Sequence, residues 1–141
     1  MIAAIWNRVN TKRFWPTAGA VFAWIFLSDF IIHKLWLKSA YQKTASLWRP
    51  EAEMGQYMSW MMSGEFLTAF FLSFIFTKGY EGKGWQEGAR YGAFMGLFSV
   101  SQMCMNYAVT PLPSTLFWSW VGAGMFQAIM AGVIASWVYK K

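Results

Sequence analysis

The chain has 141 residues, of which 57% are hydrophobic, 21% aromatic and 13% charged, with a formal net charge of +6. Soluble domains carry about 25% charged residues, so a soluble globule of this composition would expose much apolar surface. Disordered chains are poor in aromatic residues, which leaves an integral membrane protein as the prediction.

Four continuous apolar runs are long enough to cross the hydrocarbon core of a bilayer, which takes about 20 helical residues. They cover residues 14–37, 55–77, 88–109 and 115–139. In residues 1–13 the apolar side chains recur near helical spacing, which predicts a short amphipathic helix at the membrane interface. The predicted fold class is an all-α integral membrane protein, an antiparallel four-helix transmembrane bundle of one domain.

The basic residues are distributed unevenly between the two sides that four spans would create. The side with both termini and the second loop holds Arg8, Lys12, Arg13, Lys78, Lys83, Arg90, Lys140 and Lys141. The other side holds only Lys34, Lys38, Lys43 and Arg49. Because positive residues stay inside, we predict that both termini are cytoplasmic. Basic residues that flank apolar spans serve as topology signals and form no cluster, so we predict no nucleic-acid partner.

Small residues recur every four positions in the third and fourth runs. The two ladders are Gly88, Gly92 and Gly96, and Gly124, Ala128 and Gly132, which Ser136 extends. Small residues at this spacing let helix backbones approach closely in a membrane. We predict that the ladders face each other or face copies of themselves in a second subunit.

Several polar side chains interrupt the apolar runs. Asp29 and His33 lie one helical turn apart in the first run, and Glu65 lies near the middle of the second. Helical rise puts Asp29 about 12 Å and Glu65 about 15 Å below the outer surface. The third run adds Gln102 and Asn106, and the fourth adds Gln127. An ionisable side chain at this depth implies a partner or a function. We predict a polar pocket in the outer half, formed by Asp29, His33, Glu65, Gln102 and Asn106.

Three interpretations of this pocket stay open. It is a hydrogen-bonded network that orients the helices, a proton- or cation-linked site, or a metal site. The spacing of Met54, Met58 and Met62 offers thioether ligands for Cu(I), with His33 nearby. Methionine is also a common filler of apolar packing. The single cysteine, Cys104, excludes a cysteine-based zinc site within one chain, and the sequence assigns no cofactor.

A resemblance to a known family rests on three features. The first run ends in Lys34-Leu35-Trp36-Leu37-Lys38, the third opens with Glu87-Gly88 and helical glycines, and the last loop is Pro111-Leu112-Pro113. Over residues 18–138 the chain resembles the small four-span bacterial membrane proteins of domain-of-unknown-function family seventeen-sixty-one. The resemblance implies a four-span fold in the bacterial inner membrane, with no known activity and no catalytic residues.

The sequence holds no nucleophile elbow, phosphate-cradling loop or zinc-protease helix, so we predict that the protein is not an enzyme. The first functional hypothesis is an oligomer or an accessory subunit of a membrane complex, in contact with lipid. The second is a proton- or cation-linked small transporter or channel subunit. A Cu(I)-binding protein and a protein that binds lipid or quinone are further alternatives.

Overall fold

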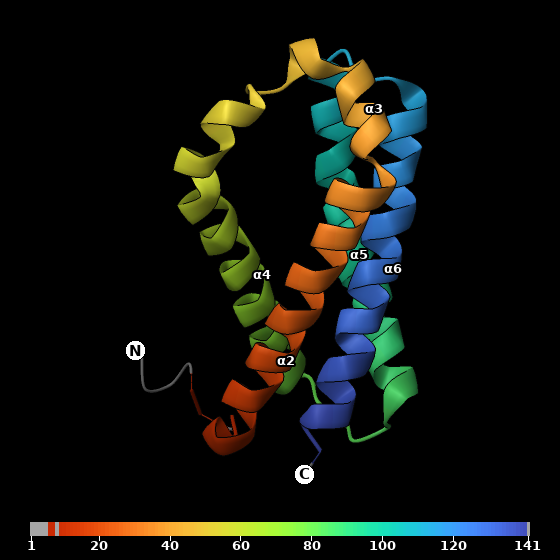
Figure 1. Ribbon diagram of the computed structural model, residues 1–141. Coiled ribbons are helices and arrows are strands. Elements are labelled where there is room, and N and C mark those ends of the chain that lie inside the picture. The colour runs from red at the N-terminus through yellow and green to blue at the C-terminus, as the bar shows by residue number, and fades with distance from the viewer. Residues whose placement is uncertain (1–5, 8, 141) are drawn as a thin grey trace.

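The computed structural model describes residues 6, 7 and 9–140, and these fold into helices joined by short turns (Figure 1). The elements are α2 (Thr11–Asp29), the π-helix η1 (Phe30–Trp36), α3 (Lys38–Lys43), the 3₁₀-helices η2 (Ala45–Leu47) and η3 (Glu51–Tyr57), α4 (Met58–Lys78), α5 (Trp85–Val109) and α6 (Ser114–Val138). The prediction of an all-helical chain is confirmed for the described residues.

Three helical stretches are long and apolar enough to cross a membrane, namely Thr11–Trp36, Ala45–Lys78 and Ser114–Val138. Helix α5 has 25 residues, the same length as α6. It is less apolar than the others because it carries Glu87, Arg90 and several amide and hydroxyl side chains.

The boundaries of the first two helices differ from the predicted runs. The first helix begins at Thr11 rather than at residue 14. Helix α4 begins at Met58 rather than at residue 55, because residues 51–57 form a 3₁₀-helix. Of the predicted interfacial helix over 1–13, residues 1–5 and 8 lie outside the described residues.

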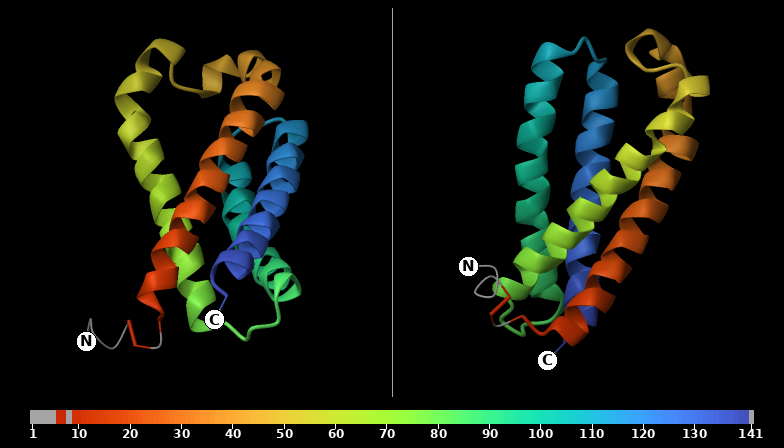
Figure 2. Two further views of the ribbon diagram at one scale, coloured as in Figure 1. Left: turned by 60° about the horizontal axis from the view of Figure 1, so that its bottom comes forward. Right: turned by 90° about the vertical axis from the view of Figure 1, so that its left-hand side faces the viewer.

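The long helices share two ends, which we name by what lies there. At the terminal end are the start of α2, the end of α6 and the turn between α4 and α5 (Figures 1 and 2). At the α3 end are α3, η2, η3 and the turn between α5 and α6. Helix α4 leans so that its upper part lies away from α5 in both the front and the side view.

Helices α5 and α6 pack backbone to backbone through the two small-residue ladders. A Cβ atom on Gly88 would overlap the carbonyl oxygen of Gly132, and one on Gly92 would overlap that of Ala128. A Cβ on Gly96 would meet Met125 Sδ at 2.8 Å, and one on Gly124 would meet Met103 Cε at 3.0 Å. The prediction that the ladders face each other is therefore confirmed within one chain.

The terminal end holds the main core, formed where α2, α4 and α6 meet. Its buried side chains are Val21, Ile25, Ala69, Phe76, Ala131, Ala135 and Tyr139. The rings of Phe76 and Tyr91 lie 5.4 Å apart, and Tyr91 Oη donates to the Leu72 carbonyl at 2.6 Å. These contacts fasten the lower part of α4 to α5.

The turn before α5 is held by a buried carboxylate. Glu87 accepts the backbone N–H groups of Glu81 at 2.6 Å and Lys83 at 2.7 Å. Gly82 and Gly84 have φ values of +79° and +73°, which a side chain would strain. The carboxylate at this end of α5 also lies at the favourable, positive end of the helix dipole.

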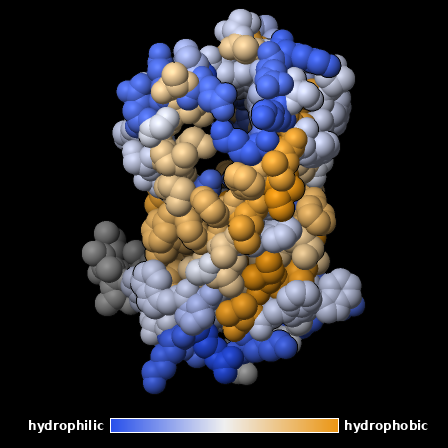
Figure 3. All heavy atoms as spheres, viewed as in Figure 1, coloured by the Kyte–Doolittle hydropathy of each residue, from blue (hydrophilic) through white to orange (hydrophobic). Residues whose placement is uncertain are grey.

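The surface is divided into apolar and hydrophilic zones, as the sequence is divided into apolar runs and polar connections. Apolar residues form a belt across the middle of the face seen in Figure 3, and hydrophilic residues gather at both of its ends. Exposed residues of this belt include large side chains from every long helix, such as Phe26, Phe66, Phe94 and Phe126. A belt of this kind is suited to contact with acyl chains rather than with water.

Candidate functional site

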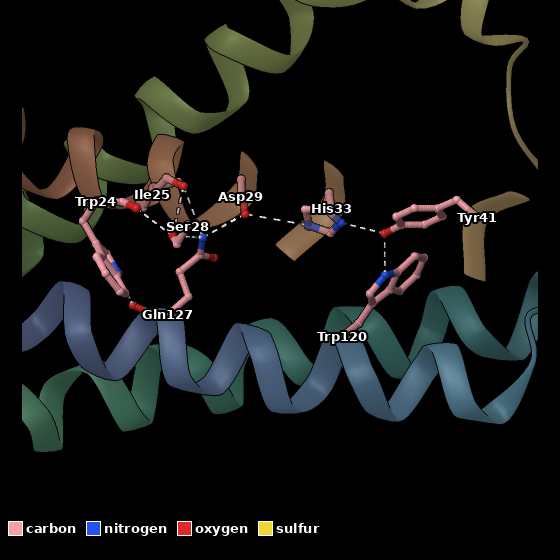
Figure 4. Close-up of polar contacts among 8 residues, drawn as sticks. All are labelled: Trp24, Ile25, Ser28, Asp29, His33, Tyr41, Trp120 and Gln127. Carbon is pink, nitrogen blue, oxygen red and sulfur yellow. Dashed lines mark hydrogen bonds and ion pairs between the residues drawn. The ribbon is translucent and has the colours of Figure 1, made fainter. Parts of the chain in front are cut away.

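A row of polar side chains runs along the upper part of α2 and η1, on the side that faces α6 (Figure 4). It begins at Gln127 of α6, whose Nε2 donates to Asp29 Oδ1 and to Ser28 Oγ, each at 2.8 Å. The amide thereby links α6 to α2 through two side chains. In an apolar surrounding, such interhelical hydrogen bonds fix the relative position of two helices.

The residues just below Asp29 hold Gln127 in place. Trp24 Nε1 donates to the backbone carbonyl of Gln127 at 3.0 Å. Ser28 Oγ lies 2.6 Å from the Trp24 carbonyl and 3.0 Å from the Ile25 carbonyl, so its proton stays within α2. Gln127 is thus positioned by the bond from Trp24 to its backbone carbonyl. Its side chain is positioned by Ser28 Oγ, an acceptor whose own proton is already bonded within α2.

Above Asp29 the row continues through His33 to the α3 end. His33 Nε2 lies 3.7 Å from Asp29 Oδ1, and His33 Nδ1 lies 2.6 Å from Tyr41 Oη. Trp120 Nε1 donates to the same Tyr41 oxygen at 2.8 Å. Five side chains from four helical elements therefore form one line from Gln127 to Trp120.

The donors and acceptors in this line determine where the protons sit. An indole N–H only donates, so Tyr41 Oη accepts from Trp120 and directs its own proton to His33 Nδ1. A neutral imidazole carries one proton, which then lies on Nε2, the nitrogen that faces Asp29. The histidine is therefore oriented as a donor toward a carboxylate.

His33 belongs to the π-helix, which explains its position. The backbone N–H of Leu37 donates to the Ile32 carbonyl at 2.8 Å, a bond that spans five residues instead of four. π-Helical segments are rare and are frequently found at functional sites. The wider turn leaves His33 on the same side as Asp29 while the chain bends into α3, which brings Tyr41 to the imidazole.

Tyr41 lies on α3 within a small second core of Leu37, Leu112 and Leu116, with Trp48 and Trp120 around it. Burial raises the pKa of the Tyr41 phenol above its ordinary value of 10.0. The hydrogen bond from Trp120 opposes this shift, and the negative charge of Asp29 adds to it. The phenol therefore keeps its proton at neutral pH and serves as a donor to His33.

Glu65 lies on α4, across from the row and outside it. Within the described residues its Oε2 atom is buried and has no hydrogen-bond partner. It lies within electrostatic reach of Asp29. The structure thus brings Asp29 and His33 into contact as predicted, and leaves Glu65 near them but not bonded to them.

The two amides predicted for this pocket are placed differently. Gln102 and Asn106 are exposed in the upper part of α5, and their side chains take no part in the row. The physical reason is the lean of α4, which uncovers this part of α5. Gln127, which the sequence identified as a polar residue of the fourth run, forms the bonds expected of Gln102 and Asn106.

Only two of the three methionines predicted to share one helix face lie in the same helix. Met54 lies in the 3₁₀-helix η3, whereas Met58 and Met62 lie in α4. A 3₁₀-helix turns by about 120° per residue, so Met54 does not continue the face of the other two. In residues 6, 7 and 9–140, no three His, Cys, Asp or Glu side chains are grouped so as to hold a metal ion.

The residues that sequence reasoning missed are Ser28, Tyr41, Trp24 and Trp120. Tyr41 belongs to the predicted outer loop, and nothing in its spacing indicates that the loop folds back onto the first helix. The only available signal was the aromatic-rich composition around Trp48 and Trp120, which also suits an interfacial belt.

The chain was compared with protein families, curated proteins and solved structures, and none of them matches it. Tyr41 and His33 share a hydrogen bond of 2.6 Å, and the carboxylate of Asp29 lies 3.7 Å beyond the imidazole. These three titratable groups in succession are of the kinds that exchange protons in membrane proteins.

Proposed function

We propose that this chain is a multi-pass protein of the bacterial inner membrane, with four antiparallel spans and both termini in the cytoplasm. The start of α2, the end of α6 and the 79–84 turn lie at one end, which supports this topology. That end also carries Lys12, Arg13, Lys78, Lys83, Arg90 and Lys140. Helix α5 would be the remaining span, added to the three long apolar stretches, and its glycine ladder would pack against α6. On this topology the α3 end faces outward.

The function we propose is proton-linked transport or conduction through the outer half of the membrane. The observation that carries it is the line Tyr41–His33–Asp29, with distances of 2.6 and 3.7 Å. The line runs from the outer loop to the level at which Gln127 fastens α2 to α6. A purely structural network needs no titratable group, whereas this one contains three in succession.

Proton flux in proteoliposomes tests the proposal. Vesicles that contain a pH-sensitive dye are given a membrane potential, negative inside, that drives protons inward. Acidification of the lumen is then recorded. We expect wild-type protein to carry protons, and Asp29→Asn to lose most of the flux because the titratable carboxylate at the end of the row is gone. Ser101→Ala, an exposed residue outside the row, is the control. Equal flux in wild type, Asp29→Asn and empty vesicles would refute the function.

A second candidate, an oligomer or accessory subunit, is supported by a different observation. From Leu97 to Val109 helix α5 is exposed on nearly every side, yet it is the least apolar of the long helices. A helix of this composition gains from a protein partner in the membrane. Native mass spectrometry of gently solubilised protein tests this candidate, which predicts a dimer or a larger complex rather than a monomer.

A further inference from the structure

Helices α4 and α5 diverge from a common point. Counting residues along each helix from that point shows which side chains lie at the same level. The rings of Phe76 of α4 and Tyr91 of α5 are in tilted contact at the terminal end. Eleven residues make about three full helical turns, or roughly 16 Å along the axis. Glu65 lies eleven residues before Phe76, and Gln102 lies eleven residues after Tyr91. Both side chains therefore leave their helices on the sides that meet at Phe76 and Tyr91, and at one level.

The space between these two sides is open. On α4, Met58 and Met61 lie within about 40° of the direction of Glu65 and are 49% and 42% exposed, although they are on the inward side. On α5, Gln102 and Asn106 are exposed. The surface in Figure 3 is hollowed in its upper half, with hydrophilic atoms at the bottom of the hollow. Met62 lies about 60° from the direction of Glu65 and is half-buried.

We propose that this hollow, which we call the α4–α5 site, binds a small primary ammonium ion with an apolar body. Glu65 would take the charge, and the amide oxygens of Gln102 and Asn106 would accept the remaining N–H groups. The inference rests on the proposed membrane transport function and names its substrate class. It uses none of the side chains in the row from Gln127 to Trp120, which we call the proton row.

The chemistry of the walls favours this ligand over the alternatives. The single carboxylate with a buried, unpartnered oxygen calls for a cation and disfavours an anion. A divalent metal would need more anionic or imidazole ligands than the described residues bring together. The amide oxygens are acceptors for N–H groups, and the thioethers of Met58, Met61 and Met62 form an adaptable, polarisable wall for an apolar body.

Binding of benzylammonium to the purified protein in lipid nanodiscs, measured by calorimetry, tests the site. We expect saturable binding of benzylammonium and none of neutral benzyl alcohol. Glu65→Gln should weaken binding by at least about tenfold, because a charge-assisted hydrogen bond is lost. Wild type should prefer benzylammonium to benzyltrimethylammonium, and Gln102→Leu should remove that preference because the quaternary ion has no N–H to donate.

Two matched controls lie on the far sides of the same helices. Ser63 points about 160° away from Glu65, and Cys104 about 140° away from Tyr91 and its side of α5. Ser63→Ala and Cys104→Ser should therefore bind like wild type. Equal binding of benzyl alcohol, or unchanged binding by Glu65→Gln, would overturn the site.

A labelling experiment covers the case in which Glu65→Gln does not fold. In a Cys104→Ser background, Met61→Cys keeps Glu65 and places one thiol in the hollow. A charged thiol reagent should label it, and benzylammonium should remove most of that labelling while leaving Leu97→Cys unaffected. Undiminished labelling of Met61→Cys would count against the site. Loss of binding with intact proton flux would refute only this inference, and loss of flux with intact binding would refute only the proposed function.

Discussion

The two halves of this molecule are built on different principles. In the terminal half, helices meet through backbone contacts and a dry aromatic core, as at Gly88 against Gly132 and Phe76 against Tyr91. In the α3 half, α4 stands apart from α5, and hydrogen bonds between side chains, such as that from Gln127 to Asp29, lie beside a small core of Leu37, Leu112 and Leu116. The difference indicates that the terminal half supplies stability, while the α3 half keeps polar groups accessible for function.

The largest expected effect breaks the terminal half at its closest backbone contact. In Gly92→Ala the new Cβ would overlap the Ala128 carbonyl, so α5 and α6 must separate. We expect a loss of about 2–3 kcal/mol in the free energy of unfolding, typical of overpacking. Gly122→Ala on α6 is the control, because nothing lies within 4 Å of its Cβ. Circular dichroism during denaturation in detergent measures both variants, and equal stability would show that the ladder contact is not tight.

A smaller effect is expected where the two helices of the α3 half are joined. Gln127→Leu removes the hydrogen bonds to Ser28 and Asp29 but keeps the bond from Trp24, which goes to the backbone carbonyl. Interhelical hydrogen bonds in membranes contribute about 0.6–1.7 kcal/mol, so we expect a loss of about 1–2 kcal/mol. A double-mutant cycle with Asp29→Ala, which removes the acceptor, isolates the pair. Additive effects of the two substitutions would mean that the bond contributes nothing.

The parts of the fold that follow from regular patterns could be predicted from the sequence. Apolar length predicts the long helices, and the four-residue spacing of Gly88, Gly92 and Gly96 predicts close approach to α6. The start of α4 at Met58 could not be predicted, because a 3₁₀-helix preserves the apolar composition while changing the twist. The π-helix at Phe30–Trp36 leaves no mark in hydropathy either.

The candidate site was predictable only in part for a related reason. Asp29 and His33 are local partners on one helix, so their contact follows from spacing alone. Which amide reaches Asp29 depends on how α4 leans and how α6 is rotated, and both are set by packing between elements far apart in the sequence. Gln102 and Gln127 are equivalent on composition, and only the structure distinguishes the one bonded to Asp29 from the one facing the open hollow.

Alkaline titration tests the burial of the Tyr41 phenol, which lies in the α3 half near the outer end of the proton row. Because the pKa of Tyr41 is raised in the folded state, its contribution to stability is fully present below pH 10.0 and is lost as the pH rises through the folded value. Tyr41→Phe should lack this alkaline loss and cost about 1 kcal/mol at neutral pH through its missing hydrogen bonds. The tyrosinate absorbance of wild type minus Tyr41→Phe reports the titration. A difference curve centred at or below pH 10.0 would contradict the burial of this phenol.

The smallest effect is expected at the turn between α4 and α5, at the terminal end. Glu81 lies 2.7 Å from Lys83 Nζ and 3.2 Å from Arg90 Nη2. The hydrogen bond and charge of Lys83 lower the pKa of Glu81, so its contribution is present above its ordinary value of 4.5 and is lost as the pH falls through the folded value. Since the carboxylate is exposed and screened, salt should abolish most of this contribution. Glu81→Gln should thus change stability slightly at neutral pH and low salt, and not at all once the pH has fallen below the folded pKa of Glu81. Glu87→Gln should behave otherwise, because its carboxylate is buried and holds the backbone N–H groups of Glu81 and Lys83. If Glu81→Gln proved the more damaging of the two in thermal unfolding, the turn would depend on its surface charges rather than on the buried carboxylate.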